Sequence, residues 1–250
     1  MKALAVVLVV LLQSPFTALA SGESEATTFE AAGVQSVSVD AEYLDVEVHG
    51  DTGLVSTLTG GVSVESPAYP QGYRVVHDQV GGTLRIWVDR GPFSWPMGRD
   101  RLVVHLPQGV NARIHSVSGS IRADGLTADR FAFSSTSGRI ELRSIEGTVD
   151  ASSVSGRITL DSVKGRFSAK TVSGAIRGVA LEPTVSASFN SVSGSIDVSF
   201  NMSLDELRFD LSSVSGSITA DRVRAARGLR MGNGDVLVTG RTISGSQVYR

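Results

Sequence analysis

One six-residue pattern recurs through the second half of this chain and limits the folds open to it. It first appears at residues Ser116–Ile121 (SVSGSI), and clear copies follow at intervals of 18 to 22 residues. These copies end at the isoleucines Ile140, Ile158, Ile176, Ile196 and Ile218. Residues Met231–Val236 are interpreted as a degenerate seventh copy. A sustained period of this length indicates a repeat architecture, in which each unit packs on its neighbours.

A finer period of nine residues lies inside the longer one. Residues 135–179 divide into nines with an apolar residue at the second, sixth and usually the eighth position, and usually a glycine at the fourth. Each nine fits one short strand and one turn, and two nines make one coil. Because a single coil cannot bury its own apolar face, stacked coils must share a core. The sequence therefore predicts an all-β fold, a β-solenoid of about seven coils of 18–22 residues over residues 109–250.

Stacked coils place equivalent residues on top of one another, so we expect ladders of identical side chains. One internal ladder should consist of the repeated isoleucines. A second internal ladder should consist of Val117, Val154, Val172, Val192 and Val214, with Thr136 as its odd member. Serine and threonine flank each repeated glycine, and we interpret them as hydroxyls that satisfy backbone groups of the turns, with a polar binding face as the alternative. A meander of antiparallel hairpins folded into a sandwich is the rival architecture.

Residues 21–108 lack the repeat but contain runs that alternate between apolar and polar residues. We expect an N-terminal region of antiparallel β-strands here, continuous with the solenoid and capping it. The segment 91–98 has the glycine and proline content of a loop, yet it carries Phe93, Trp95 and Met97. These three side chains are candidates for contact with a partner; alternatively, they cover an open end of the solenoid.

The first twenty residues have the pattern of a cleavable signal peptide. Lys2 precedes an apolar run over residues 3–12, and residues 18–20 (ALA) form a small-residue cleavage site, with cleavage expected after Ala20. We expect a periplasmic or secreted protein without an integral membrane segment after signal removal. The chain has no cysteine, which excludes disulfides and thiolate chemistry. A net charge of −2 without basic clusters argues against binding to nucleic acid.

No group of residues has the spacing of an active site. The segment 232–235 (GNGD) resembles part of a calcium-binding repeat, but serine, arginine or alanine occupies the Asp235 position in the other copies. The candidate carboxylates do not share one repeat position, and Gly-x-Ser-x-Gly is absent. We therefore predict no catalytic residues, no cofactor, no metal and no enzymatic activity.

The run Arg101–Gly109 (RLVVHLPQG), followed by VSGSI at 117–121 and its copies, resembles the bacterial DUF4097 family. The resemblance implies an exported or envelope-associated β-solenoid, and members of this family are often labelled adhesins. The leading hypothesis is a non-catalytic exported scaffold or adhesin-like protein that binds an unknown envelope macromolecule, either protein or glycan. The alternative is a carbohydrate-active enzyme or glycan-binding solenoid. A third hypothesis is self-association through the open ends of the solenoid.

Overall fold

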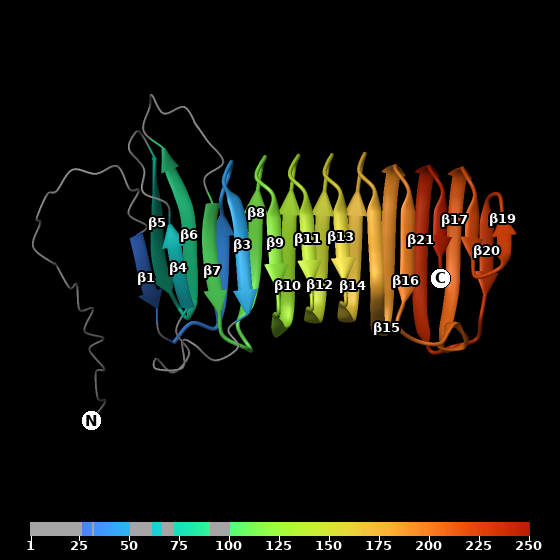
Figure 1. Cartoon of the computed structure of the whole chain (residues 1–250), viewed down its shortest axis with the longest axis horizontal. Coiled ribbons are helices and arrows are strands. Elements are labelled where there is room, and N and C mark those ends of the chain that lie inside the picture. Colours follow the sequence, from blue (N-terminus) through green and yellow to red (C-terminus); the bar gives the residue numbers. More distant parts are fainter. Residues whose placement is uncertain (1–26, 32, 51–61, 67–72, 91–100) are drawn as a thin grey trace, which may run out of the picture.

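The computed structural model describes residues 27–31, 33–50, 62–66, 73–90 and 101–250. The chain winds into a long stack of coils, and each coil contributes one strand to each of two sheets (Figure 1). Neighbouring coils in the middle of the stack pair parallel and in register, with Ile140 opposite both Ile121 and Ile158. The predicted all-β solenoid is confirmed, and the antiparallel sandwich is wrong.

Sheet A contains the shorter strand of each central coil. In spatial order, from one end of the stack to the other, its strands are β1 (Thr27–Ala31), β4 (Val62–Ser66), β7 (Arg101–Leu106), β3 (Asp45–Gly50), β9 (Ile121–Asp124), β11 (Ile140–Arg143), β13 (Ile158–Asp161), the first part of β15 (Ile176–Ser193), β16 (Ile196–Phe200), β22 (Gln247–Tyr249), β18 (Ile218–Ala220) and β19 (Val223–Ala225).

Sheet B contains the longer strands. Its spatial order is β5 (Tyr73–Val80), β6 (Thr83–Arg90), β2 (Ser36–Asp40), β8 (Asn111–Ser116), β10 (Thr127–Ser135), β12 (Glu146–Ser153), β14 (Lys164–Thr171), the second part of β15, β21 (Val236–Ser244), β17 (Leu207–Ser215) and β20 (Gly228–Met231). A 3-10 turn, η1 (Leu204–Glu206), precedes β17.

The core lies between the two sheets and is filled by ladders of apolar side chains. All six repeated isoleucines are buried, which confirms the predicted isoleucine ladder. On the sheet B side, one inward row places two small residues between two large ones, since Phe133, Ala151, Ala169 and Phe189 follow one another on neighbouring strands. The chain has no cysteine, so this buried core is held without disulfides.

The repeated hydroxyls turn inward at the bend between the two sheets. In three successive coils, Ser135, Ser153 and Thr171 are buried, and each accepts a hydrogen bond from the backbone N–H of the glycine three residues later, at 2.8, 2.8 and 3.0 Å. A buried N–H without such a partner would cost free energy. The interpretation of the repeated hydroxyls as a ladder that satisfies the turns is confirmed for the first hydroxyl of each of these copies; the second, at Ser137, Ser155 and Ser173, is exposed.

Close stacking of the turns explains the repeated glycine. A Cβ atom added at Gly156 would overlap the carbonyl oxygen of Gly138, and one added at Gly174 would overlap that of Gly156. These glycines do not have positive φ angles, so close backbone approach is the property that the repeat requires.

The order of the coils in space differs from their order in the sequence at both ends of the stack. Strands β21 and β22 lie between the coil of β15 and β16 and the coil of β17 and β18 (Figure 1). At the other end, β2 lies between β6 and β8, and β3 lies between β7 and β9. These pairings are parallel, so the expectation of an antiparallel N-terminal region is wrong for β2 and β3; β4 and β5 do pair antiparallel.

The assignment of the seventh repeat copy to residues 231–236 is wrong, as the inserted C-terminal coil shows. Residues 242–247 (TISGSQ), not residues 231–236, stack on the other copies, and Gln247 occupies the isoleucine position between Ile196 and Ile218. The buried Gln247 amide donates to the Ser212 carbonyl at 2.7 Å and accepts from the Tyr249 hydroxyl at 2.9 Å. Burial raises the pKa of the Tyr249 hydroxyl above its ordinary value.

The proposed signal peptide at residues 1–20 lies outside the described residues. Within the part of the chain that the structure describes, no helix has the length and apolar character needed to cross a bilayer.

Candidate functional site

The repeated valines do not form an internal ladder. All five are exposed, from 36% at Val117 to 71% at Val214, so this prediction is wrong. The physical reason is strand alternation: Phe167, Ala169 and Thr171 of β14 point inward, which directs Val172 outward. Ile243 replaces valine in the inserted C-terminal coil and is also exposed.

The exposed side chains form one continuous row that crosses sheet B near the C-terminal ends of its strands, which we call the valine row. In spatial order it consists of Val154, Val172, Val192, Ile243 and Val214, with Thr136 next to Val154. Each member comes from a neighbouring coil, so the row follows the inter-strand spacing of about 4.8 Å. Exposed apolar side chains in an unbroken line are unusual on a solvated surface, which makes this row the candidate interaction site.

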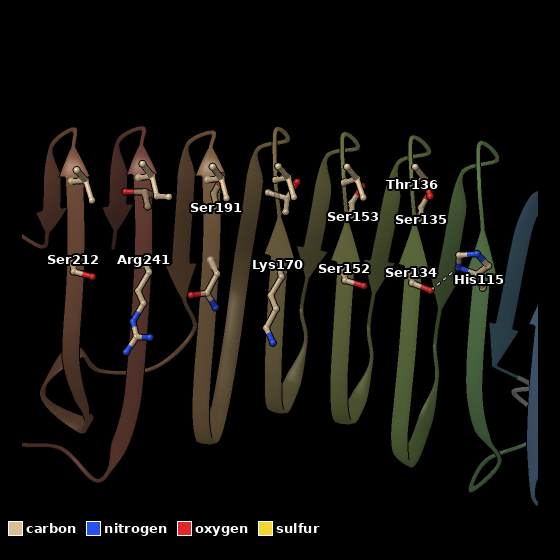
Figure 2. Close-up of a pocket in the computed structure, with 18 residues that line it drawn as sticks. His115, Ser134, Ser135, Thr136, Ser152, Ser153, Lys170, Ser191, Ser212 and Arg241 are labelled. Atoms are coloured by element: carbon tan, nitrogen blue, oxygen red, sulfur yellow. Dashed lines mark hydrogen bonds between the residues drawn. The ribbon is translucent and has the colours of Figure 1, made fainter.

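A second row runs beside the valine row and is polar. It consists of the residues two positions earlier on each strand, in spatial order His115, Ser134, Ser152, Lys170, Asn190, Arg241 and Ser212 (Figure 2). His115 Nδ1 lies 3.0 Å from the Ser134 hydroxyl. We call this set the polar row. Together the two rows make the surface amphipathic, with apolar side chains on one side and polar side chains on the other.

The two rows are the walls of a groove with a volume of about 640 Å³. Its floor is the buried hydroxyl ladder, represented here by Ser135, Ser153, Thr171, Ser191 and Thr242. These hydroxyls are engaged within the turns; the Thr171 hydroxyl, for example, accepts from Gly174 and donates to the Gly156 carbonyl. The groove therefore presents the valine row and the cationic and neutral side chains of the polar row to a ligand, while the hydroxyls of its floor are already engaged.

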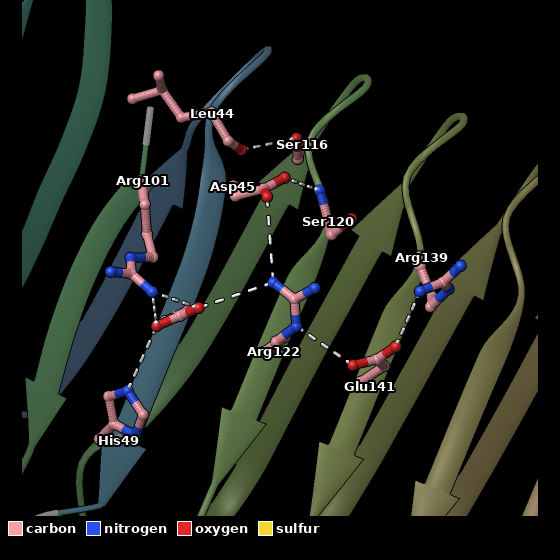
Figure 3. A network of polar contacts seen from close by, with 10 residues as sticks. Leu44, Asp45, His49, Arg101, Ser116, Ser120, Arg122, Arg139 and Glu141 are labelled. Atoms are coloured by element: carbon pink, nitrogen blue, oxygen red, sulfur yellow. Dashed lines mark hydrogen bonds and ion pairs between the residues drawn. The ribbon is translucent and has the colours of Figure 1, made fainter. Parts of the chain in front are cut away.

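Sheet A carries a different surface, in which charges of opposite sign face each other across neighbouring strands (Figure 3). Arg101 and Glu47 are 3.0 Å apart, and Arg122 Nε lies 3.2 Å from Glu141. Arg122 also lies 3.7 Å from Glu47, so this arginine joins the two carboxylates. Cross-strand pairs of this kind stabilise a sheet modestly.

The described residues hold no cluster of three or more histidine, aspartate or glutamate side chains that could bind a metal ion. Asp235 is exposed and does not line the groove that the repeat copies form. Phe93, Trp95 and Met97, the candidate contact residues from the sequence, lie outside the described residues.

The groove was missed from the sequence because valine was assigned to the core by its hydrophobicity. A signal was available: the inward residues of each long strand, such as Val149, Ala151 and Ser153, fix the alternation, and carrying it one residue further places Val154 outside.

Comparison with known proteins supports the fold. The structure of a putative adhesin from Bacteroides fragilis NCTC 9343 is 11% identical and has a TM-score of 0.52; the match covers 92% of this chain and 98% of that one. A putative lipid binding protein from Parabacteroides distasonis ATCC 8503 is 18% identical with a TM-score of 0.50, covering 92% and 97% of the two chains. At such identities the likeness concerns the fold alone. No curated protein matches the chain.

The family profile described as Toastrack DUF4097 matches residues 108–233, which include the central coils and most of the groove lining; Arg241, Thr242 and Ile243 lie beyond the match. The resemblance read from the Val-Ser-Gly-Ser-Ile repeat is thereby confirmed, and the chain belongs to the DUF4097 family.

Proposed function

We propose that this protein is a non-catalytic binding scaffold of the cell envelope, and that it holds an elongated ligand or partner along the groove of sheet B. The carrying observation is the valine row, in which Val154, Val172, Val192, Ile243 and Val214 remain exposed in register on consecutive coils. The coils hold this row rigidly, because each is paired to two neighbours through its backbone. A preorganised apolar surface binds without the cost of ordering it.

The location outside the cytoplasm is part of the proposal. It is supported by the apolar run at residues 3–12, by the small-residue site at residues 18–20 and by the absence of cysteine. We divide the chain into a signal peptide (1–20), an N-terminal β-strand region (21–108) and the repeat solenoid (109–250). The two structural neighbours, a putative adhesin and a putative lipid binding protein, are both compatible with a binding role.

Sedimentation of the purified protein with envelope fragments tests the proposal. We expect the protein to sediment with the fragments and a Val154→Ser/Val192→Ser variant to remain in solution. The variant replaces exposed side chains, so its fold and thermal stability should be preserved. A matched control, Val179→Ser/Val185→Ser, removes exposed valines that do not line the groove and should sediment like the unaltered protein. Equal sedimentation of all three proteins would contradict the proposal.

The alternative of a carbohydrate-active enzyme retains one supporting observation. A hollow of about 310 Å³ on sheet A is lined by Glu47, Asp124, Glu141 and Asp161. The arginine between Glu47 and Glu141 argues against an acid–base pair. Incubation with cell-wall and plant polysaccharides tests this alternative, and release of soluble sugars that is lost in Glu141→Gln would establish it in place of the scaffold.

A further inference from the structure

We propose that the groove binds a single-chain anionic amphiphile, with the acyl chain along the valine row and the acidic headgroup held by Lys170 and Arg241. This inference rests on the proposed function and names the chemistry of the ligand. It is carried by the charge of the groove, by the uniformity of its apolar wall and by the pairing of its backbone.

The two cations stand on strands separated by a single strand. Lys170 of β14 is opposite Asn190 of β15, and Asn190 is opposite Arg241 of β21. Two inter-strand steps place their Cα atoms about 10 Å apart. Both side chains belong to the polar row and line the groove beside the apolar residues two positions further on, Val172 and Ile243 (Figure 2). An acidic group between Lys170 and Arg241 therefore lies next to the apolar wall.

The charge of the groove is one-sided. Its lining contains a lysine, an arginine and a histidine and no carboxylate, although the chain as a whole carries a net charge of −2. Within the described residues, neither Lys170 nor Arg241 has an ion pair, and the described nearby carboxylates on the same sheet have other partners. Asp150 pairs with Arg130 at 3.0 Å and Asp210 with Arg230 at 3.3 Å. Two cations without internal counterions complement a ligand that brings its own negative charge.

The apolar wall favours an acyl chain over a peptide. The strands that line the groove are internal to sheet B and paired on both sides, so their backbones offer no edge for an added strand. An extended peptide would also bring backbone amides against five consecutive branched alkyl side chains, where they would lose water without gaining partners. An acyl chain carries no polar group along its length and can lie on a uniform row.

The lining also argues against a glycan. Its floor hydroxyls are used in the turns, and its only ring is the imidazole of His115 at one end. The polar row offers hydrogen bonds, but sugar recognition also draws on flat aromatic surfaces, and this lining places none along its apolar row.

Titration calorimetry with three defined probes tests the inference. Lysophosphatidylglycerol supplies one acyl chain and a negative headgroup, lysophosphatidylcholine supplies the same chain with a zwitterionic headgroup, and glycerol 3-phosphate supplies the acidic group alone. Titrated as monomers below their micelle concentrations, the first should bind, the second should bind about tenfold more weakly, and the third should give no measurable heat. A tenfold ratio corresponds to the loss of about one charge-assisted contact.

Two groove variants separate the roles of the walls. Lys170→Gln/Arg241→Gln should abolish the preference for the negative headgroup, and Val172→Ser/Val192→Ser should weaken both lipids by about tenfold or more. Arg157→Gln and Val179→Ser change one cation and one valine outside the groove and should leave binding unchanged. Circular dichroism should show that all variants are folded.

The outcomes distinguish a failure of the lipid assignment from a failure of the proposed scaffold function. Equal binding of the two lipids, or binding that survives both groove variants, would overturn the lipid assignment. If lysophosphatidylglycerol does not bind while sedimentation with envelope fragments still requires the valine row, the scaffold function stands and the ligand is not an anionic lipid. If sedimentation is also independent of the row, both are wrong.

Discussion

The isoleucine ladder and the valine row come from the same repeat, yet they have opposite relations to water. The isoleucines, such as Ile158, are fully buried between the sheets. The valines four residues earlier, such as Val154, are exposed near the C-terminal ends of the strands of sheet B. The close-packed glycine turn at Gly156 lies between them, and the chain crosses there from one sheet to the other; the buried Ser153 hydroxyl just before Val154 accepts a hydrogen bond from this turn. The repeat therefore maintains one ladder for folding and another that folding does not require.

The largest expected difference is between the two ladders themselves. Ile158→Ala should lower the free energy of unfolding by about 2–5 kcal/mol, because it leaves a cavity in a packed interior. Val154→Ala should change it by less than about 1 kcal/mol, since the side chain is already half in water. Urea denaturation followed by circular dichroism measures both. Similar losses for the two variants would mean that the valine row contributes to the core.

The hydroxyl ladder allows a matched test with a single chemical change. Thr171→Val should cost about 1–3 kcal/mol, because the buried N–H of Gly174 loses its acceptor. Thr136→Val makes the same change on the exposed row and should alter stability by less than about 0.5 kcal/mol. Amide hydrogen exchange at Gly174 should rise in the first variant alone. Unchanged exchange there would show that the hydroxyl does not protect this amide.

The inserted C-terminal coil contains a buried phenol that makes stability depend on pH. Because burial raises the pKa of Tyr249, the phenol stays neutral in the folded state while the unfolded chain ionises near its ordinary pKa. The stabilisation is complete below about pH 10 and declines above it, by about 1.4 kcal/mol for each further pH unit. Denaturation of the unaltered protein and Tyr249→Phe between pH 9 and 11 should reveal this difference in slope. Parallel slopes would place the hydroxyl in contact with water.

Exact repetition made the central fold predictable from the sequence. Isoleucines at one position of every copy indicated stacking, and hydroxyls beside a glycine indicated satisfied turns. Hydrophobicity alone gave the wrong prediction for the valines, because here a serine is buried and the valine after it is exposed. Only the alternation of inward and outward residues along the strand identifies the exposed side chain. The inserted coils could not be predicted by reading the copies in order. The last copy has Gln247 in place of the isoleucine, so it is hard to recognise in the sequence. No local sequence pattern indicates that β21 lies between β15 and β17.

The interleaved ends have a consequence for how an exported chain folds. In an ordinary solenoid each coil can dock as soon as it emerges, and structure spreads along the chain. Here the coil of β17 and β18 has no correct surface to join until residues 236–249 fill the space before it. Likewise, β2 and β3 are enclosed only after β6 to β9 have formed. Both ends therefore depend on contacts between residues far apart in sequence, which slow folding and resist fraying. A rod built in this way should open from its ends no more readily than from its middle coils.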